Sequence, residues 1–134
     1  MSQRLRIVVA EDDERLAALV EQLLDADGRF EVVGRTADGD EVVRLVEAQA
    51  PDLVLMDIGL PGQDGYEFMQ AVRSDPALAK LPAAALTAYA RAEDRRRALA
   101  VGFQMHVSKP VEPAELIAVV TNLTRIGAVM RSSA

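Results

Sequence analysis

The chain has 134 residues, half of them hydrophobic, and carries a formal net charge of −6. This length predicts one domain that is stable without covalent cross-links. The absence of cysteine excludes disulfides and thiolate metal sites. The negative charge disfavours direct binding to nucleic acid, which requires a basic surface. No apolar run approaches the roughly 20 residues that span a bilayer, so we expect a cytoplasmic protein with no membrane segment.

Short apolar runs alternate with helical patterns along the whole chain. Strands are predicted over residues 5–10, 30–34, 53–56, 83–87 and 105–108. Helices are predicted after Asp13, after Asp40, around residues 68–72, over residues 91–101, and from Pro113 onward. Residues 127–134 are predicted to be a tail or the beginning of a linker, and residues 1–126 to form the domain.

Strict alternation of strands and helices predicts an α/β fold. The strands are expected to form one parallel sheet with helices on both faces, in a doubly wound arrangement. The first and third strands are almost continuously apolar, as strands covered on both faces should be.

Polar residues follow the predicted strands at the points where the strands end. Acidic residues 11–13 follow the first strand, Asp57 follows the third, Thr87 ends the fourth, and Lys109 follows the fifth. In an open parallel sheet, ligands bind outside the carboxyl ends of the strands. We therefore expect these side chains to converge although about 100 residues separate the first from the last.

The expected cluster has a specific chemistry. Glu11, Asp12 and Asp57 would crowd negative charge, which opposes folding unless positive charge offsets it. Lys109 supplies one charge, and Mg²⁺ suits the remainder because it prefers a few carboxylate oxygens together with phosphate oxygens. A carboxylate beside such an ion can attack phosphorus. Thr87 and Lys109 could then contact phosphoryl oxygens.

Each of these residues also has an ordinary structural interpretation. Asp57 could cap a helix or stabilise a turn, and Glu11 and Asp12 could simply favour the positive end of the first helix. Thr87 could be a β-branched strand end, and Lys109 a solvated surface lysine. The functional interpretation rests on their joint occurrence.

Five short strings carry a resemblance to a known family. They are residues 8–13 (VVAEDD), 51–57 (PDLVLMD), 60–65 (LPGQDG), 86–88 (LTA) and 108–110 (SKP). In this order and spacing, over roughly residues 5–123, the chain resembles the receiver domain of bacterial two-component response regulators. The subtype is similar to receivers associated with hybrid kinases or standing alone.

The resemblance implies a flavodoxin-like (βα)5 fold with strand order 2-1-3-4-5. It implies that Asp57 accepts a phosphoryl group from a sensor histidine kinase or a phosphotransfer domain. Asp12 would bind Mg²⁺ directly, Glu11 through water, and Gly59 through its backbone carbonyl. A surface formed by residues 91–101, 105–108 and the last helix would change its partner preference, in a monomer or weak dimer.

The chain departs from the family pattern at two positions. Its acidic pair is Glu11–Asp12, where two aspartates are commoner. His106 stands where the family's switch tyrosine or phenylalanine is usual, so the aromatic part of the switch is in question. Tyr89 could pack over the mouth of the site or lie in solvent.

The leading hypothesis is a signalling module and not an enzyme with a separate substrate. A phosphatase of the haloacid dehalogenase type would need Asp-x-Asp after the first strand, and a flavin-binding module would need a Ser/Thr/Gly-rich phosphate loop there. The chain has Glu11-Asp12-Asp13 at this place, which disfavours both alternatives. A non-phosphorylated scaffold is a third alternative. The module could stand alone, relay phosphate, or belong to a longer protein, and we expect its output partner to be another protein or domain.

Overall fold

The computed structural model of the protein describes residues 4–58, 65–76, 78–87, 96, 99–100 and 102–132, with the backbone alone at residues 65–66 and 126–132. Its elements run β1 (Leu5–Ala10), α1 (Glu14–Asp27), β2 (Phe30–Thr36), α2 (Gly39–Gln49), β3 (Leu53–Asp57), α3 (Gly65–Ser74), β4 (Ala83–Thr87), β5 (Met105–Ser108) and α5 (Pro113–Ser132).

The five strands form one parallel sheet in the order β2-β1-β3-β4-β5. This confirms the predicted α/β class and the flavodoxin-like strand order. The order departs from the chain sequence between β1 and β3, which are direct neighbours with Ala10 opposite Met56. Such a switch point leaves a crevice at the carboxyl ends of the two strands.

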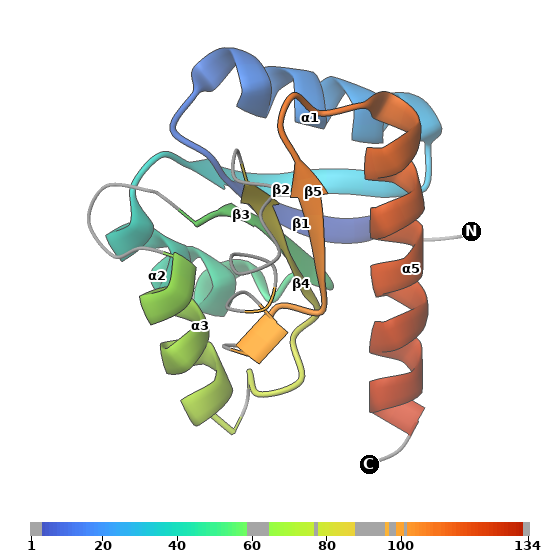
Figure 1. The fold of residues 1–134 in the computed structure, drawn as a ribbon. Coiled ribbons are helices and arrows are strands. Elements are labelled where there is room, and N and C mark those ends of the chain that lie inside the picture. Colours follow the sequence, from blue (N-terminus) through green and yellow to red (C-terminus); the bar gives the residue numbers. More distant parts are fainter. Residues whose placement is uncertain are drawn as a thin grey trace.

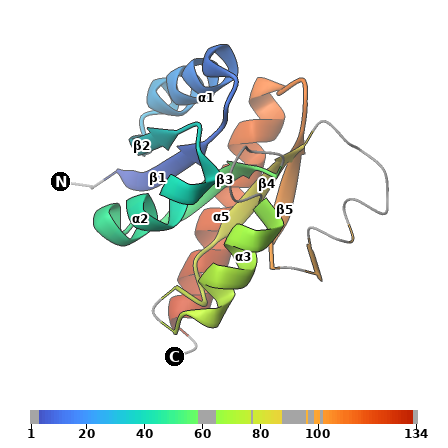
Figure 2. The same ribbon diagram turned by 90° about the vertical axis from the view of Figure 1, so that its left-hand side faces the viewer.

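Helices cover both faces of the sheet. The apolar residues of α1 and α5 pack on one face, and those of α2 and α3 pack on the other (Figures 1 and 2). Alternate residues of β1 enter the two cores, so that Ile7 and Val9 face α1 and α5 while Val8 faces α2 and α3. The sheet is thereby buried, and its polar groups are confined to its edges.

The first helix has the termini that the sequence predicts. Asp13 accepts hydrogen bonds from the amides of Arg15 and Leu16 at 3.0 and 3.2 Å. Gly28 ends the helix with a φ of 89°, in the left-handed region that favours glycine. The cap is worth about 1 kcal/mol and fixes where α1 begins, directly after the acidic residues of β1.

Two of the helices differ from their predictions or lie partly outside the described residues. The last helix does not end near Gly127 but continues to Ser132, because one glycine inside a helix costs only about 1 kcal/mol and Ala128 and Met130 favour helix. The helix predicted over residues 91–101 lies mostly outside the described residues; positions 96, 99 and 100 are helical.

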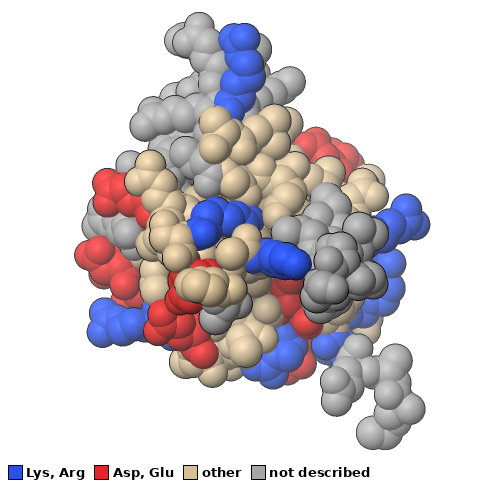
Figure 3. Space-filling view, turned by 90° about the horizontal axis from the view of Figure 1, so that it is seen from below, with Lys and Arg blue, Asp and Glu red and all other residues tan. Residues whose placement is uncertain are grey.

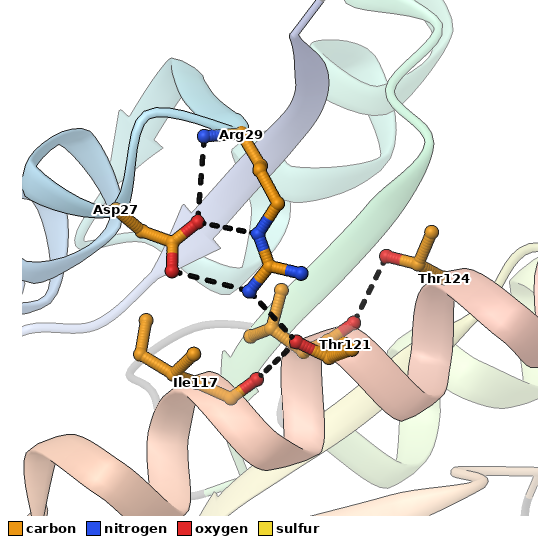
Figure 4. A network of polar contacts seen from close by, with 6 residues as sticks. Asp27, Arg29, Ile117, Thr121 and Thr124 are labelled. Carbon is orange, nitrogen blue, oxygen red and sulfur yellow. Dashed lines mark hydrogen bonds and ion pairs between the residues drawn. The ribbon is translucent and has the colours of Figure 1, made fainter.

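A polar network joins the turn after α1 to α5 (Figure 4). The Arg29 guanidinium donates to both carboxylate oxygens of Asp27 and to the Thr121 hydroxyl, which in turn donates to the carbonyl of Ile117. Arg29 also lies 5.0 Å from the ring centroid of Phe30. The contacts are exposed, so we expect them to orient α5 against the sheet with little net stabilisation.

Charged side chains are mixed over the described part of the face in Figure 3, where Lys and Arg lie among Asp, Glu and uncharged residues. Among the helices in the described part of the chain, none has the length and apolar character needed to cross a membrane.

Candidate functional site

Three carboxylates converge at the carboxyl ends of β1 and β3. Glu11 and Asp12 directly follow β1, and Asp57 is the last residue of β3. Because the two strands are neighbours in parallel register, one oxygen from each of the three side chains lies within 4.8 Å of the others. The structure thus brings together the acidic residues that the sequence analysis selected.

Lys109 reaches into this cluster from beyond β5. Its Nζ donates a hydrogen bond to Asp57 Oδ2 at 2.8 Å and lies 2.7 Å from Glu11 Oε1. Its backbone amide donates to the carbonyl of Thr87 at 2.8 Å, which fixes the lysine at the end of β4. One ammonium group therefore contacts two of the three carboxylates.

Glu11 is the most deeply placed member of the cluster, with a side chain that is 0 % exposed. Its Oε2 accepts a hydrogen bond from the amide of Asp13 at 3.0 Å. Its Oε1 lies 2.7 Å from Lys109 Nζ, and among the described residues this buried oxygen has no further polar partner. A buried carboxylate oxygen in this state favours a further positive ligand.

Burial and charge act in opposite directions on this group. Burial raises the pKa of Glu11 above its ordinary value, and the charge of Asp57 adds to the rise, while Lys109 and the Asp13 amide lower the pKa by less. For Lys109, burial alone would lower the pKa, but Asp57 and Glu11 outweigh it and raise the pKa. Lys109 therefore stays charged, and the site as a whole prefers more positive charge.

The donor set fits a hard divalent cation. Glu11, Asp12 and Asp57 offer oxygen atoms only, and one of them is the buried Glu11 Oε1, whose partner among the described residues is Lys109. Mg²⁺ takes such ligands and keeps several of its waters. The residues can therefore hold a metal ion, with Asp12 as the exposed member and Glu11 as the buried one.

Thr87 and His106 lie on one face of the sheet near the cluster. Thr87 is only 5 % exposed, and it follows Leu86, which pairs with Asp57 across the β3–β4 ladder. His106 is partly exposed and pairs with Ala85, two residues before Thr87, so the two side chains project from the same face. The phosphoryl role of Thr87 and the switch role of His106 stay predictions.

Gly59 and Tyr89 lie outside the described residues, so the metal ligand predicted at Gly59 and the cover predicted at Tyr89 have no structural account.

The sequence analysis missed the contribution of β2 to this region. A cavity of about 170 Å³ opens beside the cluster and is lined by Glu11, Asp12, Glu14, Ala17, Arg35, Thr36 and Ala37. The carbonyl of Thr36 accepts the Glu11 amide at 3.0 Å. Thr36 was not identified because the second strand was predicted to end at Gly34, whereas β2 continues to Thr36.

A larger cavity of about 360 Å³ lies away from the carboxylates, near Pro51, Leu78 and Pro82, and is mostly apolar. We place the chemistry at the carboxylate cluster, where Lys109 contacts both Glu11 and Asp57, and not at the apolar cavity.

The fold is thus a doubly wound parallel sheet with an acidic cluster at its switch point and a lysine beyond its last strand. The chain belongs to the response regulator receiver domain family, whose family model matches residues 7–121. It is therefore a receiver domain of two-component systems, as the resemblance implied.

Three relatives illustrate the match. An uncharacterized 14.6 kDa protein in the sodA1 3′ region of Leptolyngbya boryana is 40% identical over 117 residues, which cover 87% of this chain and 88% of that protein. The phosphate regulon transcriptional regulatory protein PhoB of Rhizobium meliloti is 38% identical over 90% of this chain, but the chain spans only about half (52%) of its length.

The third relative is a solved structure. The receiver domain of a sensor histidine kinase from Pseudomonas aeruginosa PAO1 superposes with a TM-score of 0.81, at 32% identity, over 91% of this chain and 98% of that one. That structure has a magnesium ion coordinated in its active site cleft.

Proposed function

We propose that the protein accepts a phosphoryl group on Asp57 from the phosphohistidine of a sensor histidine kinase or phosphotransfer domain, in a Mg²⁺-dependent reaction. The observation that carries this proposal is the position of Lys109 Nζ, 2.8 Å from Asp57 Oδ2 and 2.7 Å from Glu11 Oε1. A lysine so placed can move its hydrogen bonds to a phosphoryl group without leaving the site.

The chain's residues have separate roles in the transfer. A carboxylate oxygen of Asp57 attacks the phosphorus, the bond from phosphorus to the donor nitrogen breaks, and the imidazole leaves with its electron pair. Lys109 pairs with a phosphoryl oxygen, and the Thr87 hydroxyl donates to another. Glu11 and Asp12 would hold Mg²⁺ together with Asp57, and the bound ion would neutralise the charge of the transferring group.

The proposed role is that of an acceptor and switch. The protein would catalyse only its own phosphorylation and dephosphorylation, and would not turn over a separate substrate. Phosphorylation would shift a population between two packings of the surface near β5 and α5, which a partner protein reads. The kinase, the partner and the acceptor domain would meet in the cytoplasm, without direct contact to nucleic acid or membrane.

Incubation with acetyl phosphate and Mg²⁺, followed by intact-mass spectrometry, tests the proposal. We expect one phosphoryl group on the parent chain, none on Asp57→Asn, and none when EDTA replaces Mg²⁺. Asp52→Asn, at the opposite edge of the sheet, is the matched control and should be labelled like the parent. A phosphoryl group that persists on Asp57→Asn, or its absence from the parent chain, would refute the proposed acceptor.

A further inference from the structure

Arg73 connects three separate segments at the amino-terminal edge of the sheet. It lies in the last turn of α3, and its guanidinium donates to the carbonyl of Ala79 at 2.9 Å and to that of Gly102 at 2.7 Å, with a longer contact to Leu78 at 3.5 Å. These partners are backbone carbonyls from the connection before β4 and from the turn before β5. One side chain therefore ties α3 to the entries of two strands.

Gly102 is shaped to receive this guanidinium. Its φ is +114°, a backbone conformation that side chains rarely adopt, and a Cβ built there would lie 2.8 Å from Arg73 Nε. The Gly102 amide donates to the carbonyl of Leu99 at 3.1 Å, which closes the turn after the helical residues 99 and 100. Arg73 thus packs directly on the backbone where this helical stretch ends.

A second anchor follows within two residues. The Gln104 amide donates to the carbonyl of Ala83 at 3.0 Å, and the Ala83 amide donates to Gln104 Oε1 at 2.7 Å. Phe103, between the two anchors, is 2 % exposed and lies in the core against α2 and α3. Residues 102–104 are therefore held by a guanidinium, by a side-chain amide and by core packing.

The guanidinium geometry makes the anchor specific. Arg73 is half-buried, and a planar fork can hold several carbonyls at once, whereas a lysine ammonium is a point charge on a flexible stem. The opposite end of β5 differs, because there the contacts of Lys109 with Asp57 and Glu11 would have to rearrange when a phosphoryl group arrives. One strand thus has a fixed end and an end that depends on the state of Asp57.

We propose that Arg73 and Gln104 make residues 102–104 a fixed pivot. The pivot confines the rearrangement that follows phosphorylation to the carboxyl end of β4 and to the residues from about His106 to Lys109. This inference rests on the proposed function, which supplies the event at Asp57.

Amide hydrogen exchange followed by NMR tests the pivot, with and without beryllofluoride and Mg²⁺ as the phosphoryl analogue. In the parent chain the Lys109 amide, which donates to Thr87, should change its exchange rate on addition of the analogue, while the amides of Gly102 and Gln104 should not. In Arg73→Ala those two amides should exchange about ten- to a hundredfold faster even without the analogue, and their rates should then respond to it.

Two further variants keep the test decisive. Arg73→Lys retains the positive charge without the planar guanidinium, so the Gly102 and Gln104 amides should exchange faster in this variant too. It provides the same test if Arg73→Ala does not fold. Arg4→Ala removes an exposed arginine and should match the parent at Gly102 and Gln104. Parent-like exchange of both amides in Arg73→Lys, or a response of both amides to the analogue in the parent chain, would overturn the pivot. Failure of the analogue to change Lys109 in the parent would refute the proposed function and leave the resting-state comparison intact.

Discussion

The two edges of the sheet satisfy their charges in opposite ways. At the carboxyl edge, Glu11, Asp12 and Asp57 face one another within 4.8 Å, and the ammonium group of Lys109 contacts two of them. At the amino edge, the Arg6 guanidinium donates to the carbonyl of Gln49 at 2.7 Å, as Arg73 does to Gly102.

The amino edge of the sheet thus stabilises the fold, and the carboxyl edge holds the groups of the proposed chemistry. The arginines at the amino edge are stabilised by neutral backbone carbonyls without any further ligand. The carboxylates at the carboxyl edge repel one another and share one lysine, so a further cation would stabilise them. We therefore expect substitutions at the amino edge to lower the free energy of unfolding under all conditions. Substitutions at the carboxyl edge should have effects that depend on Mg²⁺ and pH.

The largest expected effect is at the amino edge. Gly102→Ala should lower the free energy of unfolding by about 3 kcal/mol, because a Cβ would both strain the backbone and collide with Arg73. Gly28→Ala is the matched control: its φ is +89° but no atom lies within 4 Å of the added Cβ, so it should cost only about 1 kcal/mol. Urea denaturation measures both.

A double variant sharpens this result. In an Arg73→Ala background, Gly102→Ala should cost no more than Gly28→Ala does, because only the backbone strain remains. Equal costs of the two glycine substitutions in the parent chain would show that Arg73 does not press on Gly102.

The next effect is at the carboxyl edge. Lys109→Met should lower the free energy of unfolding by about 2 kcal/mol in EDTA, because three carboxylates lose the ammonium group that two of them contact. Added Mg²⁺ should raise the melting temperature of this variant more than that of the parent, since the lysine no longer competes with the ion. Arg4→Met, whose ion pair with Asp25 is exposed, should cost about 0.5 kcal/mol or less and leave the Mg²⁺ response unchanged. Similar responses in parent and Lys109→Met would argue against a shared site.

A smaller effect has the opposite sign. Asp57→Asn should raise the free energy of unfolding by about 1 kcal/mol in metal-free buffer, because it removes one of the crowded charges. Asp52→Asn, the control at the amino edge, removes a carboxylate that accepts from the Arg6 amide and has no such crowding, so it should be neutral or destabilising. A lower melting temperature for Asp57→Asn in EDTA would contradict the crowding.

The smallest expected effect is a pH dependence. Since burial raises the pKa of Glu11 above the ordinary 4.5, the folded protein keeps this proton at pH values where the unfolded chain has lost it. The contribution of Glu11 to stability is therefore complete below pH 4.5 and is lost as the pH rises through the higher folded pKa. Thermal melts of the parent and Glu11→Gln in EDTA should diverge upward from pH 4.5, in favour of Glu11→Gln. Parallel curves would show that the folded-state pKa is not raised.

Much of this arrangement could be predicted from the sequence because it depends on local rules. Alternating strands and helices place strand-end residues such as Asp57 at one edge, and Asp13 is recognisable as a cap from its residue type and position. The continuation of α5 through Gly127 to Ser132 was not predicted, because a single glycine is too weak a signal to place the end of a helix.

The rest depends on three-dimensional geometry that leaves no pattern in the sequence. The contact of Lys109 with Glu11 is set by the register of four strands and by the reach of a flexible side chain. Arg73 was missed because backbone carbonyls, its partners, are present at every residue. The phosphoryl role of Thr87, the switch role of His106 and the metal itself stay predictions that the experiments above can decide.

The hydrogen bond between Lys109 and Asp57 joins residues that are 52 positions apart, and it has a consequence for how the protein folds. Contacts of such separation form late, after the loops between them have closed. During synthesis, Asp57 emerges well before the lysine that completes its site. A chain that is still being made, or one in which β5 has opened, therefore has the proposed acceptor but not the complete site, so the proposed phosphorylation would be restricted to molecules that have finished folding.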